Sequence, residues 1–153
     1  MLETKKRTLK KGPRAIRQDL KKKGIDKSLQ DEVLESFTYE EQLAIAMQLA
    51  EKEVRAGNRK TPTQVKQKIQ DVLMRKGYSF SIVSDVLERI QLVREEDEWE
   101  DMIAAQGEKI WRKFAAKFSG TERNMKVKQA LYQKGFPIEV INRFIEEKEH
   151  EEV

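Results

Sequence analysis

The stretch LKKKGI at residues 20–25 has the pattern leucine, three further residues, glycine and an apolar residue. The same pattern recurs as LMRKGY at residues 73–78 and as LYQKGF at residues 131–136. A β-branched apolar residue lies four positions before the leucine of each copy; these residues are Ile16, Ile69 and Val127. Apolar residues spaced by four and followed by glycine are typical of a helix that ends in a left-handed cap, where glycine avoids the steric cost of a Cβ atom. We therefore expect the chain to turn back into the core after each glycine.

The residues after each glycine also match. The fifth, ninth and tenth positions are apolar in every copy: Leu29, Val33 and Leu34, then Ile82, Val86 and Leu87, then Val140, Phe144 and Ile145. This spacing predicts one buried face on a second helix, so the repeated unit is a helix, a glycine elbow and another helix. The elbow glycines Gly24, Gly77 and Gly135 are spaced by 53 and 58 residues, which indicates a real but irregular repeat.

A third helix is expected after each of the first two helix–elbow–helix units. The first of these begins at the capping-box pattern of Thr38 and Glu41, and the second is a long helix from about Glu95 to Phe118. The same capping-box pattern at Thr61 and Gln64 begins the first helix of the second repeat. Proline suits the first turn of the helices that begin at Gly12-Pro13 and Thr61-Pro62. We expect an N-terminal arm, or the end of a missing preceding repeat, at 1–11. Three-helix repeats are expected at 12–58 and, with a long third helix, at 59–120, followed by a truncated two-helix repeat at 121–147 and an acidic tail at 148–153.

The predicted fold class is therefore all-α, with tandem three-helix repeats stacked into an elongated, curved rod. A repeat of about 50 residues is only marginally stable alone, because it buries a small share of the surface of its unfolded chain, so each repeat is expected to pack on its neighbours. Charged residues make up 38% of the 153 residues, and glycine and proline are few, which favours exposed helices over strands. Cysteine is absent, and the chain has no apolar run long enough for a membrane span. We expect a cytoplasmic protein, monomeric and without a membrane partner.

Charge is distributed unevenly along the chain. Residues 1–24 hold ten basic residues against two acidic ones, whereas residues 146–153 hold five glutamates against one lysine. Such an arrangement suits a partner of mixed charge or two partners, although the acidic end also fits a solvated, frayed tail.

The basic residues gather on the helices that precede the elbows, and the helices after the elbows are mostly neutral or acidic. This distribution disfavours sequence-specific DNA binding, which needs base-reading side chains on the second helix, and favours contact with phosphates. The candidate binding stripe comprises Lys10, Lys11, Arg14, Arg17, Lys21, Lys22, Lys66, Lys68, Arg75, Lys76, Arg123, Lys126, Lys128 and Lys134.

The run GPRAIRQDLKKKGI at residues 12–25 resembles the signature stretch of the RecX regulatory family, and LMRKGYS at 73–79 resembles the repeat that follows it. The resemblance extends from residue 12 to about residue 147. Many members carry a further N-terminal repeat, so we expect this chain to lack an N-terminal portion.

The resemblance implies a partner and a function. RecX proteins bind the RecA recombinase filament on single-stranded DNA, suppress its ATP hydrolysis and strand exchange, and favour filament loss. A similar chain would be a negative modulator of homologous recombination and the SOS response that lies in the filament groove, with auxiliary contact to DNA. The alternative is a general DNA-binding helical protein that contacts phosphates without reading sequence.

Catalytic and metal sites are not expected. The sequence has no phosphate loop, dinucleotide fingerprint or nucleophile–base pattern, and His150 has no companion histidine. We predict neither an enzyme nor a cofactor. Trp99 and Tyr78 fit core positions, whereas Trp111 fits its helical stripe less well and is the one aromatic candidate for stacking on a base.

Overall fold

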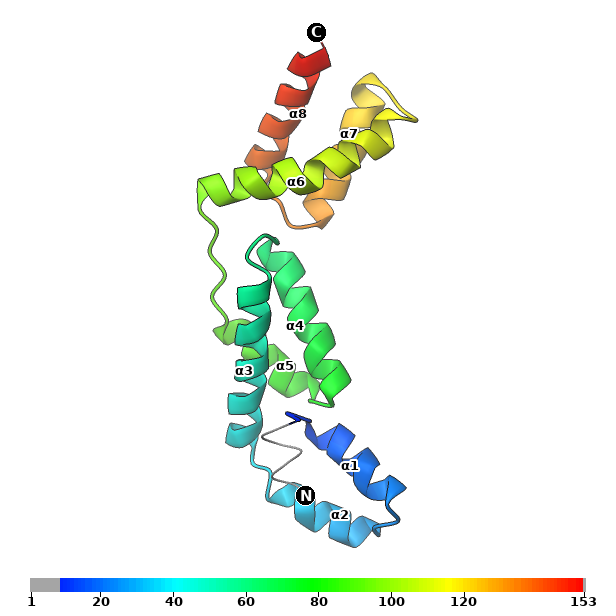
Figure 1. The fold of residues 1–153 in the computed structure, drawn as a ribbon, viewed down its shortest axis with the longest axis vertical. Coiled ribbons are helices and arrows are strands. Elements are labelled where there is room, and N and C mark those ends of the chain that lie inside the picture. The colour runs from blue at the N-terminus through cyan, green and yellow to red at the C-terminus, as the bar shows by residue number, and fades with distance from the viewer. Residues whose placement is uncertain (1–8, 153) are drawn as a thin grey trace. The chain divides into compact units, whose positions relative to one another are not determined.

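The computed structural model describes residues 9–152, and this part of the chain consists of helices and loops without strands (Figure 1). The helices are α1 (Pro13–Lys22), α2 (Lys27–Glu35), α3 (Tyr39–Ala56), α4 (Pro62–Lys76), α5 (Phe80–Arg89), α6 (Glu96–Ala115), α7 (Gly120–Gln133) and α8 (Ile138–Glu152). The all-α fold class is thus confirmed. Within the described residues, no helix combines the length and apolar character needed to cross a membrane.

The three elbow glycines share one backbone geometry. Gly24, Gly77 and Gly135 have φ angles of +79°, +97° and +99°. The amide of the residue after each glycine donates to the leucine carbonyl five positions earlier: Ile25 to Leu20 at 3.2 Å, Tyr78 to Leu73 at 3.1 Å and Phe136 to Leu131 at 3.3 Å. This is the Schellman pattern of helix termination, and it confirms the elbows predicted from the repeated stretch.

The predicted capping boxes are also present. The Thr38 amide donates to the Glu41 carboxylate, and the Glu41 amide donates to Oγ1 of Thr38 at 3.2 Å. Thr61 and Gln64 make the same reciprocal pair at 3.0 and 3.2 Å. These bonds satisfy amides that a helix start leaves without intrahelical partners, which explains where α3 and α4 begin.

The helices form two compact units. Unit 1 takes in the residues up to Ala56 together with Lys66–Gln91, and unit 2 takes in Gly57–Val65 together with the chain from Leu92 onward. Helix α4 therefore begins in unit 2 and ends in unit 1. The expectation of a stacked, elongated rod stays a prediction.

In unit 1, α3 packs against α5 and α1 packs against α2. Ile82, Val83 and Val86 of α5 are buried, as are Ala46 and Ala50 of α3. The equivalent apolar face of α2 is more open: Leu29 is 48% exposed, whereas its counterparts Ile82 and Val140 are 0% and 6% exposed. The predicted buried face of α2 is therefore only partly buried, because its main neighbour among the described helices is α1.

In unit 2, α6, α7 and α8 pack on one another around a single apolar core. Edge-to-face ring contacts join α6 to the rest of the unit, with Trp99 and Phe136 at 5.7 Å and Trp111 and Phe144 at 6.4 Å between ring centroids. A Cβ atom on Gly107 would lie 2.8 Å from the Phe144 ring, so this glycine lets α8 approach α6 closely.

Two predicted boundaries differ. Helix α6 ends at Ala115 rather than Phe118, although Phe118 stays partly buried beside Phe114 at 6.4 Å between ring centroids. The residues expected to form a frayed acidic tail continue α8 as far as Glu152. Lys148 is held there by carboxylates of α6 and α8, which explains the longer helix. Residues 1–8 of the expected arm lie outside the described part of the chain.

Candidate nucleic-acid and partner interface

Most residues of the candidate stripe lie on exposed helix surface. The exposed ones are Arg14, Lys21, Lys22, Lys66, Lys68, Arg75, Lys128 and Lys134, and the half-buried ones are Lys10, Lys11, Arg17, Lys76 and Lys126. Those on α1 and on α4 belong to unit 1, and those on or just after α7 belong to unit 2. That all of them form one binding surface stays a prediction.

Within unit 1, the start of α1 meets the end of α4. The Gly12 amide donates to the Lys76 carbonyl at 2.7 Å, and the Arg14 amide donates to the Gly77 carbonyl at 3.1 Å. Tyr78 is fully buried beside them, and its hydroxyl donates to the Lys10 carbonyl at 3.0 Å. This packing brings together basic residues that are more than 60 positions apart in the sequence.

A cleft of about 370 Å³ lies at this meeting point, and we call it the α1–α4 cleft. Its lining residues are Lys11, Ala15, Gln18, Asp19, Val72, Arg75 and Lys76. Three cations therefore face one carboxylate, and Lys11 and Asp19 form an ion pair at 2.7 Å. Lys76 donates to the Leu9 carbonyl at 3.1 Å, while the side chain of Arg75 is exposed. The excess of positive charge and the planar guanidinium suit a phosphate group.

Besides Lys11 and Lys76, further stripe residues are engaged within the protein, among them Arg17 and Arg123. Arg17 makes an ion pair with Asp31 at 2.9 Å and donates to Gln30 at 3.3 Å, so it links α1 to α2. Arg123 is 7% exposed, and its guanidinium lies 4.3 Å from the centroid of the Trp111 ring. Arg123 is therefore a buried cation–π partner and does not belong to an exposed basic surface.

The same contact corrects the interpretation of Trp111. Its side chain is 7% exposed and packs against Arg123 and Phe144, so the ring is not available to stack on a base. The sequence contains a signal that the position of Arg123 beside Trp111 is buried. Ile16 and Val65 each lie three residues after the proline that begins their helix and are buried, and Arg123 lies three residues after Gly120, the first residue of α7.

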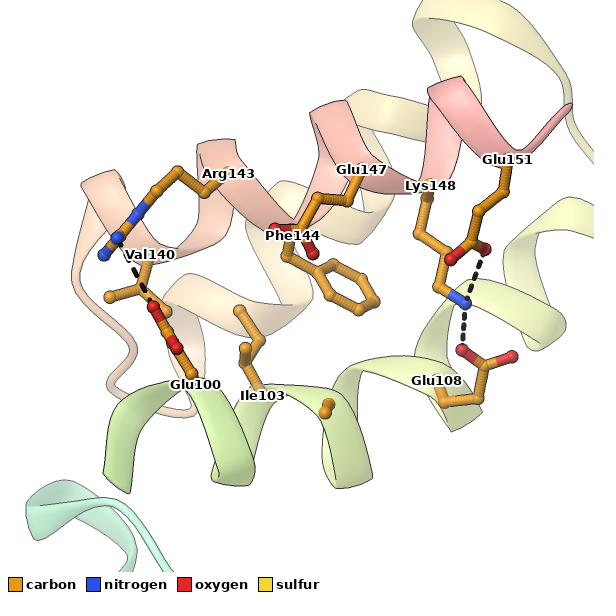
Figure 2. A pocket seen from close by; sticks show the side chains of 10 residues that line it. Glu100, Ile103, Glu108, Val140, Arg143, Phe144, Glu147, Lys148 and Glu151 are labelled. Atoms are coloured by element: carbon orange, nitrogen blue, oxygen red, sulfur yellow. Dashed lines mark hydrogen bonds and ion pairs between the residues drawn. The ribbon is translucent and has the colours of Figure 1, made fainter. Parts of the chain in front are cut away.

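A second hollow, which the sequence did not predict, lies between α6 and α8 in unit 2 and has a volume of about 250 Å³ (Figure 2). Ile103, Val140 and Phe144 supply its apolar surface. Arg143 lies 2.7 Å from Glu96 and 3.6 Å from Glu100, and Lys148 pairs with Glu108 and, at 3.3 Å, with Glu151. The sequence signal for this hollow is the four-residue spacing of its lining residues along each helix, as in Glu100, Ala104 and Glu108.

These ion pairs fasten α8 to α6. The hydrogen bond from Lys148 lowers the pKa of Glu108, and the same bond raises the pKa of Lys148. Because every cation lining the hollow is paired with a carboxylate in this way, the arrangement stabilises the helix pair. Among the described residues, no group of three histidine, cysteine, aspartate or glutamate side chains could hold a metal ion.

Family models match most of the chain. The model described as the third three-helix domain of RecX matches residues 40–87 and again 96–145, and the model described as the second three-helix domain of RecX matches residues 1–34. The chain belongs to the RecX family. The resemblance seen in the repeated elbows is therefore confirmed, and the RecX domains account for the three-helix repeats of this fold.

Relatives named regulatory protein RecX agree with this assignment. The chain is 35% identical to that of Halalkalibacterium halodurans over 94% of this chain and 54% of the relative. It is 34% identical to that of Bacillus subtilis over 97% and 56%, and 38% identical to that of Leuconostoc mesenteroides over 97% and 55%. This RecX chain thus spans about half the length of the curated relatives it matches. No solved structure matches the chain.

Both matches of the third-domain model begin at a long helix. The match at 40–87 covers α3 to α5, and the match at 96–145 begins at α6 and continues into α8. The sequence-based division begins each repeat at the helix before an elbow instead. The division at 12–58, 59–120 and 121–147 stays a prediction.

Proposed function

We propose that this RecX chain is a negative modulator of RecA-type recombinase filaments on single-stranded DNA. It acts by binding in the filament groove, where it suppresses ATP hydrolysis and strand exchange during homologous recombination and the SOS response. It works without catalysis, in the cytoplasm. Membership of the RecX family supports the regulatory role. The RecA-type recombinase filament is the proposed partner because the family resemblance implies it.

The observation that carries the DNA contact is the α1–α4 cleft. Lys11, Arg75 and Lys76 surround a space of about 370 Å³ and face a single carboxylate, Asp19. Phosphate contact of this kind is independent of sequence and gives dissociation constants of about 10⁻⁴ to 10⁻⁶ M at physiological salt. Because this affinity is modest, the proposed modulator also needs contacts with recombinase subunits, and DNA has an auxiliary role.

Recombinase ATP hydrolysis on single-stranded DNA separates this function from simple DNA coating. A filament modulator is expected to inhibit hydrolysis at well below one chain per recombinase subunit. A general phosphate-binding protein would inhibit only when it covers the DNA. Inhibition that appears only at saturating coverage would therefore contradict the proposal and favour the alternative.

A matched pair of variants tests the cleft itself. Arg75 and Arg55 both lie in the last turn of a helix in unit 1 and are both exposed, but only Arg75 lines the cleft. We expect Arg75→Glu to weaken binding to an oligothymidylate at least about fivefold, since a phosphate contact is replaced by repulsion. Arg55→Glu should leave the affinity within about twofold, because it lies outside the cleft. Equal losses in both variants, with helicity unchanged, would show that the cleft has no special role.

A further inference from the structure

A short basic segment lies across the end of α4 in unit 1 (Figure 1). It comprises Leu9–Gly12, and we call it the basic turn. Each of its residues makes a hydrogen bond or an ion pair with a part of the unit that is more distant in the sequence. The partners, in order along the turn, are the Lys76 ammonium at 3.1 Å, the Tyr78 hydroxyl at 3.0 Å, the Asp19 carboxylate at 2.7 Å and the Lys76 carbonyl at 2.7 Å.

The backbone of the basic turn does not follow from its own sequence. Among the described residues, Lys10 is the one residue other than glycine with a positive φ angle, which is +54°. A lysine adopts this left-handed conformation only where surrounding groups hold it there. The carbonyl that accepts the hydrogen bond from Tyr78 is that of Lys10 itself, so the hydroxyl acts at the strained residue of the turn.

The hydroxyl of Tyr78 adds something that core packing does not require. Phe136 occupies the equivalent position after the elbow glycine Gly135 and is buried, as Tyr78 is, so a bare aromatic ring is sufficient to fill such a position. Burial raises the pKa of Tyr78, and its hydroxyl therefore keeps its proton and remains a donor at neutral pH. The acceptor that explains the hydroxyl is the Lys10 carbonyl.

The basic turn supplies one wall of the α1–α4 cleft. Lys11 lines the cleft from the turn, and Lys76, which lines it from α4, is anchored on the Leu9 carbonyl. Arg75, the third cation of the cleft, is not among the partners of the turn. Two of the three cations therefore keep their places only while the turn is folded.

We propose that Tyr78 is a positioning residue for phosphate binding in the α1–α4 cleft. Its hydroxyl holds the basic turn so that Lys11 and Lys76 face one phosphate of a single strand together with Arg75. Tyr78 acts through these cations and does not touch the ligand. This role rests on the DNA contact proposed for the cleft, and it names the residue that prepares the cleft for that contact.

A single removed oxygen atom tests the role. Tyr78→Phe should weaken binding to an oligothymidylate about three- to fivefold, because losing one hydrogen bond lowers the fraction of chains in which the turn is folded. Tyr39→Phe is the matched control, since its hydroxyl donates to Asp85 in the same unit and neither residue lines the cleft. It should leave the affinity within about 1.5-fold. Fluorescence anisotropy gives the affinities, and thermal unfolding shows that both variants are folded.

A double-mutant cycle shows whether Tyr78 acts through the turn. In a Lys11→Gln background the turn no longer brings its own cation into the cleft, so Tyr78→Phe should then weaken binding by less than about twofold. Lys66→Gln is the control background, because Lys66 is an exposed residue of α4 that does not line the cleft. There Tyr78→Phe should keep its full effect, which a general loss of charge would not explain.

Trypsin reports on the basic turn without DNA. Cleavage after Lys10 and Lys11 requires the turn to open, so Tyr78→Phe should accelerate it at least about threefold. Arg59 and Lys60, in the loop between α3 and α4, provide the internal reference. Cleavage after them should keep its rate, because they do not contact the turn. Mass spectrometry of the fragments separates the sites.

Unchanged cleavage after Lys10 and Lys11 would overturn the proposal, as would a loss of affinity in Tyr78→Phe no larger than in Tyr39→Phe. Full addition of the losses from Tyr78→Phe and Lys11→Gln would also overturn it, since residues that act separately add. Failure of the DNA contact has a different signature, because Arg75→Glu would then leave the affinity unchanged. That result would remove the role of Tyr78 in binding, whereas faster cleavage in Tyr78→Phe would still establish its hold on the turn.

Discussion

At the scale of single residues, the elbow glycines perform two different tasks. Each adopts the left-handed backbone that ends its helix, which is a property of the local chain and could be predicted from the repeated stretch. Gly77 and Gly135 also allow close approach of a helix start, whereas no described atom lies within 4 Å of the place that a Cβ of Gly24 would take. The second task depends on a distant segment, so the local sequence does not contain it.

This difference predicts unequal costs of the same substitution. Gly24→Ala should lower the free energy of unfolding by about 1–2 kcal/mol, the cost of a Cβ atom in the left-handed region. Gly77→Ala should cost more, about 3 kcal/mol or above, because its Cβ would also lie 2.5 Å from the amide nitrogen of Ala15. Urea denaturation followed by circular dichroism compares the two variants. Equal losses would contradict the assignment of Gly77 as a packing position.

Arg123 shows why a charge pattern alone does not identify a surface. The sequence placed it in the basic stripe because it lies on a helix before an elbow. Its long side chain nevertheless occupies a buried position that isoleucine or valine fills in the other repeats, with its charge against the Trp111 ring. Arginine can bury its aliphatic stem in this way, so its charge is a poor guide to its exposure.

At the scale of helices, local signals were sufficient for the elements but not for their contacts. Capping boxes, prolines and apolar spacing gave the starts of α1, α3 and α4. The α1–α4 cleft requires residues 11–19 to meet residues 72–76, and the hollow between α6 and α8 requires Arg143 and Lys148 to face carboxylates of α6. Helical periodicity shows which face of a helix is buried but not which partner covers it.

The contact between α6 and α8 predicts a dependence on pH. The pKa of Glu108 is lowered in the fold, chiefly by its hydrogen bond from Lys148, with Arg112 adding a further attraction at 3.4 Å. A carboxyl group with a lowered pKa stabilises the fold above its unfolded pKa of about 4.3, and this contribution is lost as the pH falls through the folded value. Glu108→Gln should therefore lower the melting temperature at pH 7, and the difference from the parent chain should shrink as the pH falls below about 4.

The control for this prediction is Glu146→Gln, an exposed position on α8. It removes one carboxylate from the same helix pair without touching Lys148. Thermal unfolding of both variants from pH 3 to pH 7 separates the specific pair from a general loss of charge. A deficit of Glu108→Gln that persists at the lowest pH would show that the pair does not supply the stability.

At the scale of the whole molecule, the chain repeats one helix–elbow–helix unit whose exposed residues differ from copy to copy. The apolar residues of each copy recur, while the exposed residues vary from the basic α1 to the acidic end of α8. The RecX models recognise the recurrent part, which explains why one domain model matches twice. Binding to a charged partner depends on the variable exposed residues. The sequence shows which basic residues are candidates, but only the folded structure shows which of them are exposed.

The last prediction concerns how many of these cations meet DNA together. For single strands, the logarithm of the binding constant falls with the logarithm of salt concentration by about 0.7 for each phosphate neutralised. If both units contact one strand, Arg75→Glu in unit 1 and Lys128→Glu in unit 2 should each reduce that slope by about 0.7, and the double variant by about twice as much. Fluorescence anisotropy of a labelled oligothymidylate between about 50 and 200 mM salt gives the slopes. A slope that Lys128→Glu leaves unchanged would restrict the DNA contact to unit 1 and leave the α7 surface for a protein partner.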